Sequence, residues 1–330
     1  HMLNMDYTAT RQNLVLKTLI PNSYRYNCMV NVIMNRYVKN EIENLSKRSL
    51  IDGGFIGRPN GTYRTDSTAW SVIALSVLTM HNDLVQKARD RLENYQLEDG
   101  RICLATDMPQ ACWPTPLAIM AWNGSREHEA LQAQAMDFLL GYEGKHFKKS
   151  HDSPIGHDTT IMGWPWIENT HSWIEPTSLA LLALDLAGKG DHHRSQEARR
   201  MLIDRQLPDG GWNYGNKTVF GRELRPMPES TGLALSALAG KIERRVAEKS
   251  ITYLKQTVDQ LTTPLSLSWS LLALGAWDEY PSNAEKLLQI CFEKQEVFGS
   301  YDTFQLSLLL ITCQSRRGLL ERLTVARWEH

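Results

Sequence analysis

The chain has 330 residues, 36 basic and 37 acidic side chains, a formal charge of −1 and 42% hydrophobic residues. This composition is typical of a globular protein and excludes disorder, and the balanced charge argues against a nucleic-acid surface. No stretch approaches the ~20 apolar residues of a membrane span, and no cysteine pair has the spacing of a zinc knuckle or a disulfide framework. We therefore expect a cytoplasmic protein with no metal and no cofactor.

The N-terminus carries no secretory pattern. The most leader-like segment, 14–20, is too short and contains Lys17. His1 and Met2 read as a cloning scar. We expect residues 3–330 to form a single domain.

A helix start recurs along the chain as an acidic or small residue, then Thr, then an apolar run. Its three clearest copies are Asp66-Ser67-Thr68-Ala69, Glu175-Pro176-Thr177-Ser178 and Glu229-Ser230-Thr231-Gly232. Weaker copies begin near Trp113, Thr263 and Asp302. Because the helices that follow are apolar nearly all round, we expect them to be buried on both sides.

A second type of helix alternates with the first. It is amphipathic and ends in a glycine turn, as in the segments 44–54, 88–100, 197–211 and 285–299. Glycine supplies the left-handed conformation of a helix C-cap. About six pairs of buried and half-exposed helices predict an all-α toroid with an inner parallel ring inside an outer ring. An open solenoid is the alternative, because periodicity alone does not show closure.

An insert at residues 143–174 interrupts the repeat. It is polar at first and aromatic afterwards, and it leads directly into an inner helix start, which predicts a lid over the mouth of the ring. The insert holds residue types that bind metals, without the tight spacing of a metal site: His151, Asp152, His157, Asp158 and His171. We therefore favour a solvated loop with His171 facing the mouth.

Parallel inner helices bring their N-termini, and the acids at those N-termini, to one mouth. The acids are Asp66, Glu175, Glu229 and Asp302. Capping alone explains Asp66 well, and Pro176 suits a first helical position. Glutamate is a weaker cap, so Glu175 and Glu229 are expected to find partners such as Arg64, Arg222 or Arg225.

Three segments carry a family resemblance: IDGGF at 51–55, RQLPDGGWNYG at 205–215 and EPTSLALLAL at 175–184. They resemble the glutamine–tryptophan repeats and inner helices of squalene cyclases and prenyltransferase β-subunits, over roughly residues 40–315. The resemblance implies a single α/α toroid that acts on an isoprenoid or other apolar chain. In class II cyclases of this superfamily, the middle Asp of Asp-x-Asp-Asp-Thr-Ala is the proton donor.

The corresponding string here is Arg64-Thr65-Asp66-Ser67-Thr68-Ala69. Asp66 matches the proton donor, whereas Arg64 and Ser67 replace the flanking acids, and Arg64 favours the ionised form of Asp66. The zinc site of the prenyltransferases is not expected, because Gln305 stands where that family has a histidine.

The acids at the mouth and the resemblance together predict the site. Asp66 is the expected acid, with Glu175, Glu229 and His171 shaping its proton affinity. The expected substrate-binding residues are Arg64, Trp113, Trp164, Trp166, Trp173, Trp212, Tyr214 and Asp302. Aromatic faces bind a polyene and stabilise a carbocation. Core packing is nevertheless the better interpretation of Trp70, Trp212 and Trp269.

Three functions stay open at this point. The first is an acid-initiated cyclase or isomerase whose partner is a hydrophobic small molecule. The second is a non-catalytic toroid that binds a lipid or a protein, and the third is a carbohydrate-active toroid with paired carboxylates. A peripheral membrane contact and a homodimer are both left open, and no nucleic-acid partner is expected.

Overall fold

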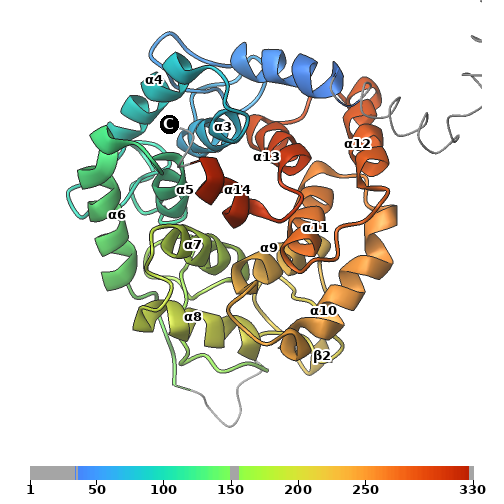
Figure 1. Ribbon diagram of the computed structural model, residues 1–330. Coiled ribbons are helices and arrows are strands. Elements are labelled where there is room, and N and C mark those ends of the chain that lie inside the picture. Colours follow the sequence, from blue (N-terminus) through green and yellow to red (C-terminus); the bar gives the residue numbers. More distant parts are fainter. Residues whose placement is uncertain (1–33, 35, 149–155, 327–330) are drawn as a thin grey trace, which may run out of the picture.

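The computed structural model describes residue 34, residues 36–148 and residues 156–326. His1, Met2 and the segment 14–20 lie outside these residues, as do His151 and Asp152. In the described residues, helices alternate between an inner and an outer ring (Figure 1).

Six inner helices form the wall of the ring in the described part of the chain. They are α3 (Thr65–Val77), α5 (Pro114–Ala121), α7 (Ile174–Leu186), α9 (Pro228–Leu238), α11 (Pro264–Ala276) and α13 (Thr303–Gln314). Nearly all of their residues are buried, as their apolar sequences predict. Each helix contacts the next in chain order, and α13 contacts α3. The ring is therefore closed, which confirms the toroid and excludes the open solenoid.

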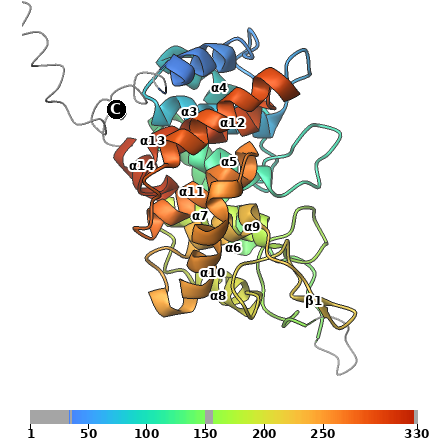
Figure 2. The same cartoon turned by 90° about the vertical axis from the view of Figure 1, so that its right-hand side faces the viewer.

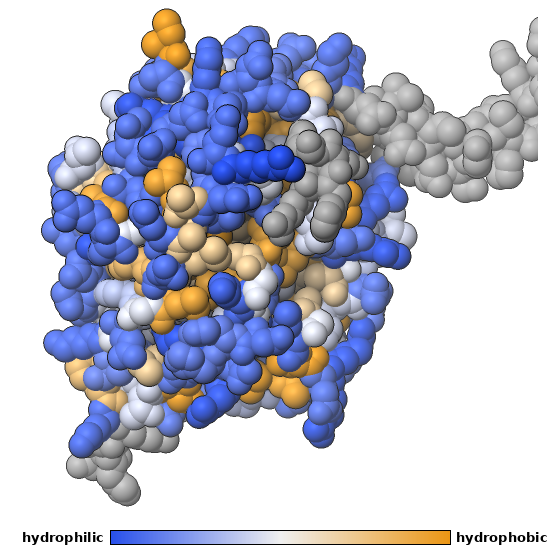
Figure 3. Space-filling model, turned by 60° about the vertical axis from the view of Figure 1, so that its left-hand side comes forward, coloured by the Kyte–Doolittle hydropathy of each residue, from blue (hydrophilic) through white to orange (hydrophobic). Residues whose placement is uncertain are grey.

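The outer ring consists of amphipathic helices whose polar faces meet solvent. They are the helix at 36–46, α4 (Asn82–Glu93), α6 (Glu129–Gly141), α8 (His193–Asp204), α10 (Arg244–Thr257) and α12 (Ala284–Phe298). Two 3-10 turns, η1 (Arg126–His128) and η2 (Val258–Gln260), and a small hairpin, β1 (Thr218–Val219) with β2 (Arg222–Glu223), complete the described elements. Hydrophilic side chains cover most of the face drawn in Figure 3, with apolar ones grouped near its middle.

The same hydrogen bond recurs before four of the inner helices, α3, α5, α7 and α9. The residue after the turn donates its backbone N–H to the Thr hydroxyl of the inner helix. Phe55 bonds Thr68 at 2.9 Å, and Trp164 bonds Thr177 at 2.9 Å, both across 13 residues. The Thr of the repeated helix start therefore holds the turn against the helix.

The end of the ring opposite the N-termini is covered by α14 (Leu319–Ala326). Arg322 donates to the carbonyl of Val77, the last residue of α3, at 2.6 Å. Asn123, just beyond α5, donates to the carbonyl of Leu323 at 3.1 Å. Figure 2 shows α14 at the left and the β1 hairpin at the right, so the two ends of the ring differ. The described helices include none that is long and apolar enough to cross a membrane.

The ring is joined by contacts between its first and last repeats. Arg48, which is buried, donates to the carbonyl of Tyr301 at 2.8 Å and to the hydroxyl of Thr303 at 3.2 Å. Tyr37 stacks on Phe292 with ring centres 6.0 Å apart. We call these contacts the seam.

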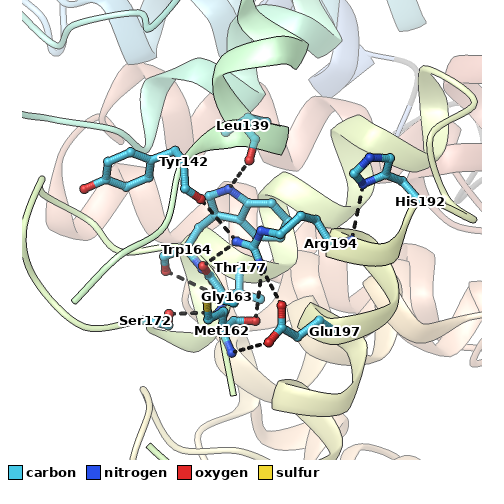
Figure 4. Close-up of polar contacts among 10 residues, drawn as sticks. All are labelled: Leu139, Tyr142, Met162, Gly163, Trp164, Ser172, Thr177, His192, Arg194 and Glu197. Atoms are coloured by element: carbon cyan, nitrogen blue, oxygen red, sulfur yellow. Dashed lines mark hydrogen bonds and ion pairs between the residues drawn. The ribbon is translucent and has the colours of Figure 1, made fainter. Parts of the chain in front are cut away.

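The described parts of the insert, 143–148 and 156–173, are held to α8 by Arg194 (Figure 4). Its guanidinium carbon lies 4.5 Å from the centre of a Trp164 ring. The same guanidinium donates to the backbone carbonyls of Tyr142 and Gly163 at 3.3 and 3.1 Å and forms a salt bridge with Glu197 at 3.2 Å. This anchor fixes the insert beside the ring. That the insert covers the mouth stays a prediction.

Candidate functional site

The inner helices all begin at one end of the ring, and the predicted acids lie there. Asp66, Glu175 and Glu229 stand in the first turns of α3, α7 and α9. Asp302 is the N-cap of α13, where its side chain and that of Gln305 form a capping box. The helix dipoles give this end a positive potential that suits anionic groups. We call this end the mouth.

Asp66 is held by Arg64 in a two-pronged salt bridge. The guanidinium Nε and Nη2 atoms donate to the two carboxylate oxygens, each at 2.8 Å. Asp66 is 5% exposed, while the Arg64 side chain is 44% exposed. The expectation that Asp66 caps its helix was wrong, because Arg64 occupies the N-cap position and Asp66 lies inside the first turn. Both carboxylate oxygens of Asp66 are therefore engaged by Arg64.

A cavity of about 570 Å³ opens beside this salt bridge, between the starts of α3 and α13. Its walls are the loop before α3, the salt bridge and the start of α13: Gly57, Arg58, Asn60, Gly61, Thr62, Arg64, Asp66, Ser67, Asp302 and Phe304. Phe304 is the one aromatic residue in this lining, and none of the predicted tryptophans contributes. The cavity beside Asp66 therefore lacks the tryptophan lining that the sequence predicts.

Glu175 and Glu229 form a second group at the mouth, on neighbouring helices. Glu229 accepts hydrogen bonds from the hydroxyl groups of Ser266 at 2.8 Å and Tyr214 at 3.3 Å. Glu175 is half-buried and has no hydrogen bond or ion pair within the described chain. Burial, and then the charge of Glu229, raise the pKa of Glu175 to about 7. Neither glutamate pairs with Arg64, Arg222 or Arg225 in the residues that the structure describes.

The local start of α7 explains why Glu175 does not cap the helix. The helix begins at Ile174, after the extended residue Trp173. Pro176 is therefore the third helical residue, and the expectation that it occupies the first was wrong. Glu175 does not serve as a cap, which leaves its carboxyl group available at the mouth.

The predicted aromatic residues divide into buried and half-buried groups. The indole N–H of Trp164 donates to the Leu139 carbonyl at 3.0 Å, and that of Trp212 donates to the Leu202 carbonyl at 2.7 Å. Both rings are at most 2% exposed, so they join the turns to α6 and α8. We leave them out of the candidate site. Their indole bonds could not be read from the sequence, because each reaches a different helix.

The remaining predicted rings stay accessible. Trp113 and Trp166 are half-buried and lie edge to face, with ring centres 5.6 Å apart. Trp173 is half-buried against His171, with ring centres 4.5 Å apart, and Tyr214 is 50% exposed. Trp173 and Tyr214 flank the start of α7 and the Glu229 carboxylate, respectively.

Trp70 and Trp269 close the interior below the mouth. Each is the sixth residue of its helix, and their ring centres are 6.1 Å apart in an edge-to-face contact. Since α13 separates α3 from α11 in the ring, this contact spans the inside of the toroid. Both are buried, at 5% and 3% exposure, which agrees with core packing.

His171 does not lie with the acids. It lines a small separate cavity with His157 and Arg205, and no contact with Glu175 occurs within the described residues. Burial, followed by the positive charge of Arg205, lowers the pKa of His171. A role for His171 beside Glu175 stays a prediction.

One cluster of metal-ligand type escaped the sequence analysis. Asp90, Glu127 and His128 bring three ligand atoms within 4.8 Å of one another on the outside of the ring. His128 Nε2 already lies 3.2 Å from Asp90, and its Nδ1 bonds the Ser125 hydroxyl at 2.8 Å. Residues from two repeats meet here, and no spacing in the sequence signals that meeting.

No protein-family model matches the chain, and the comparison with curated proteins gives no match. Solved structures do match it. The type II terpene cyclase MstE from Scytonema is 11% identical, with a TM-score of 0.61 over 89% of this chain and 98% of that one. A protein from Actinoplanes is 16% identical, with a TM-score of 0.58 over 86% and 98% of the two chains.

A novel alpha-amylase from Clostridium perfringens is 12% identical, with a TM-score of 0.55 over 85% of this chain and 97% of that one. Structures of MstE variants hold geranylgeranyl dihydroxybenzoate as substrate and merosterolic acid A as product. Likeness at this level of identity shows the fold. The chain is therefore an α/α toroid with the fold of a type II terpene cyclase.

Proposed function

We propose that the protein is a terpene cyclase-like enzyme that protonates an isoprenoid or other apolar chain at the mouth of the toroid, with Glu175 as the acid. The single observation that carries this proposal is the placement of Glu175 at the mouth, without a hydrogen-bond partner in the described chain and with a raised pKa. With a pKa of about 7, its carboxyl group keeps its proton in a large fraction of molecules at neutral pH. The fold shared with MstE supports the substrate class.

Glu175 replaces Asp66 as the preferred acid for a geometric reason. Both oxygens of Asp66 accept from Arg64, whereas the Glu175 carboxyl has no partner in the described chain. Trp173 and Tyr214 place aromatic faces near this acid, and such faces stabilise a developing positive charge. Glu229, held by two hydroxyl groups, lies close enough to Glu175 for its charge to help raise the pKa of Glu175.

A product screen tests this proposal. The purified chain is incubated with squalene, oxidosqualene and linear prenyl diphosphates, and organic extracts are analysed by mass spectrometry. We expect a new cyclic or isomerised product, and a loss of rate of about 10²–10⁴-fold in Glu175→Gln. Glu223→Gln, on the exposed strand β2, is the matched control and should keep full activity. Loss in Asp66→Asn with full activity in Glu175→Gln would return the acid to Asp66.

A second candidate function follows from the carboxylate pair itself. Glycoside hydrolysis uses two carboxyl groups in different environments, and here Glu175 has a raised pKa while the neighbouring Glu229 accepts hydrogen bonds from two hydroxyl groups. The likeness to the alpha-amylase supports this alternative. Release of reducing ends from malto-oligosaccharides, lost in both Glu175→Gln and Glu229→Gln, is the expected sign. Turnover on neither substrate panel would favour a toroid that only binds.

A further inference from the structure

A second, smaller cavity lies between the insert and the C-terminal end of α8. It has a volume of about 110 Å³, several times the ~30 Å³ that one water occupies in the liquid. Its lining shares no residue with the cavity beside Asp66 and consists of His146, Phe147, His157, Thr159, His171, Arg205 and Asn216. The lining holds three imidazoles and one guanidinium and no carboxylate.

Arg205 brings a buried positive charge to this cavity. It is 3% exposed and ends α8 as its C-cap residue. One of its terminal nitrogens donates to the Ser172 carbonyl, whereas its Nε has no partner. Burial lowers the pKa of Arg205 to about 10, which leaves it charged at neutral pH.

No carboxylate forms a salt bridge with Arg205 within the described chain, although the charge of Asp204 raises the pKa of Arg205. The nearest acid in sequence, Asp204, points its oxygens at Lys217, 3.7 Å away, and at the backbone N–H of Asp158, 2.9 Å away. The carbonyl groups at the end of α8 offset part of the charge. A buried guanidinium without a salt-bridge partner is unfavourable, so an anion in the cavity would be stabilised.

The imidazoles add hydrogen-bonding capacity. His157 is 2% exposed and its Nδ1 atom has no partner, and the Nε2 atom of His146 is also buried without one. Burial is the main cause that lowers the pKa values of all three histidines, and Arg205 contributes to each. They are therefore neutral at pH 7. The rings of His157 and His171 can each turn one N–H towards a ligand, whereas His146 bonds the Thr159 backbone.

A metal ion fits this cavity poorly. Within the described chain, the group of three ligand atoms closer than 4.8 Å is the one at Asp90, so the three imidazoles do not converge. Arg205 would also repel a cation. From this geometry we propose that the cavity binds a phosphate-like oxyanion, held by the Arg205 guanidinium and by N–H groups of His157 and His171.

Two sources share this chemistry, namely inorganic phosphate and the phosphate end of a larger ligand. The experiment titrates the full chain, in buffer free of phosphate and sulfate, with inorganic phosphate and separately with geranyl diphosphate. Isothermal titration calorimetry measures binding, and thermal melting measures stabilisation. We expect saturable binding of phosphate and a rise in Tm. Tighter binding of the diphosphate would also support the cavity and identify the larger ligand as its source.

Variants connect the binding to this cavity. Arg205→Gln should weaken phosphate binding roughly 10–100-fold, and His157→Asn roughly 2–10-fold. Arg225→Gln, outside the cavity, is the control and should bind as the wild type does. His171→Asn serves if Arg205→Gln fails to fold, with circular dichroism as the check.

Three results would overturn the proposal: no binding by the folded wild type, equal binding by the folded cavity variants, or stabilisation by zinc chloride but not by phosphate. Because the readout is binding alone, its failure is independent of the product screen.

Discussion

The surroundings of Glu175 change the pKa of its carboxyl group. Its pKa is about 7, against an ordinary value of 4.5, and burial contributes more than the charge of Glu229. Between these values the folded chain binds more protons than the unfolded chain. The stability that the proton provides is therefore present below pH 4.5 and lost as the pH rises through about 7.

The loss of stability with rising pH gives a prediction that can be tested without a substrate. We compare the change that Glu175→Gln makes in the free energy of unfolding at pH 8 and at pH 5. This change should be more stabilising at pH 8 by roughly 1–2 kcal/mol, after a discount for partial exposure. Urea denaturation at the two pH values measures the difference. Glu223→Gln on the exposed hairpin should show no such dependence. Equal effects of Glu175→Gln at both pH values would mean that its pKa is ordinary.

Single residues also mark the limit of sequence reasoning. Arg64 stands two positions before Asp66, so its influence on that carboxylate could be predicted, although its two-pronged geometry could not. Arg205 and His157 belong to different repeats, and only folding brings them to one cavity. The repeat pattern of the sequence does not indicate that Arg205 is buried.

Among the elements, α9 and α11 approach each other closely at Gly232. A Cβ atom built there would lie 2.4 Å from the backbone carbonyl oxygen of Trp269, which cannot move without shifting α11. Gly232→Ala should therefore destabilise the fold by about 1–3 kcal/mol, measured by chemical denaturation. Gly141→Ala, at the end of α6 with open space around its Cβ, is the matched control and should be neutral or slightly stabilising. A harmless Gly232→Ala would show that the helices are less tightly packed.

The elements were the most predictable level of the molecule. The apolar runs after Thr68, Thr177 and Thr231 are inner helices, because a helix that is apolar all round must be buried. The outer helices can begin before the segments predicted for them. The helix α8 starts at His193, whereas the predicted segment was 197–211. Helix starts were harder to predict. By residue type Asp66 suits an N-cap and Pro176 a first helical position, but both helices begin before these residues.

At the scale of the whole molecule, closure depends on the seam. Arg48→Met keeps the bulk of the side chain but removes its bonds to the Tyr301 carbonyl and the Thr303 hydroxyl. We expect a loss of about 1–3 kcal/mol in the free energy of unfolding, because buried acceptors lose their donor. Arg245→Met, whose side chain is 80% exposed, should change it by less than about 0.5 kcal/mol. The same small effect for both variants would show that the seam bonds add little.

The seam can form only after the ribosome has synthesised both of its ends. Arg48 and Tyr301 are 253 residues apart, so at about 5–20 residues per second roughly 13–50 s pass between their appearance. During that interval α3 has been made, but α13, which covers one of its sides, has not. The nascent chain therefore displays an apolar helix face for most of its translation, and a chaperone that shields such faces would aid its maturation.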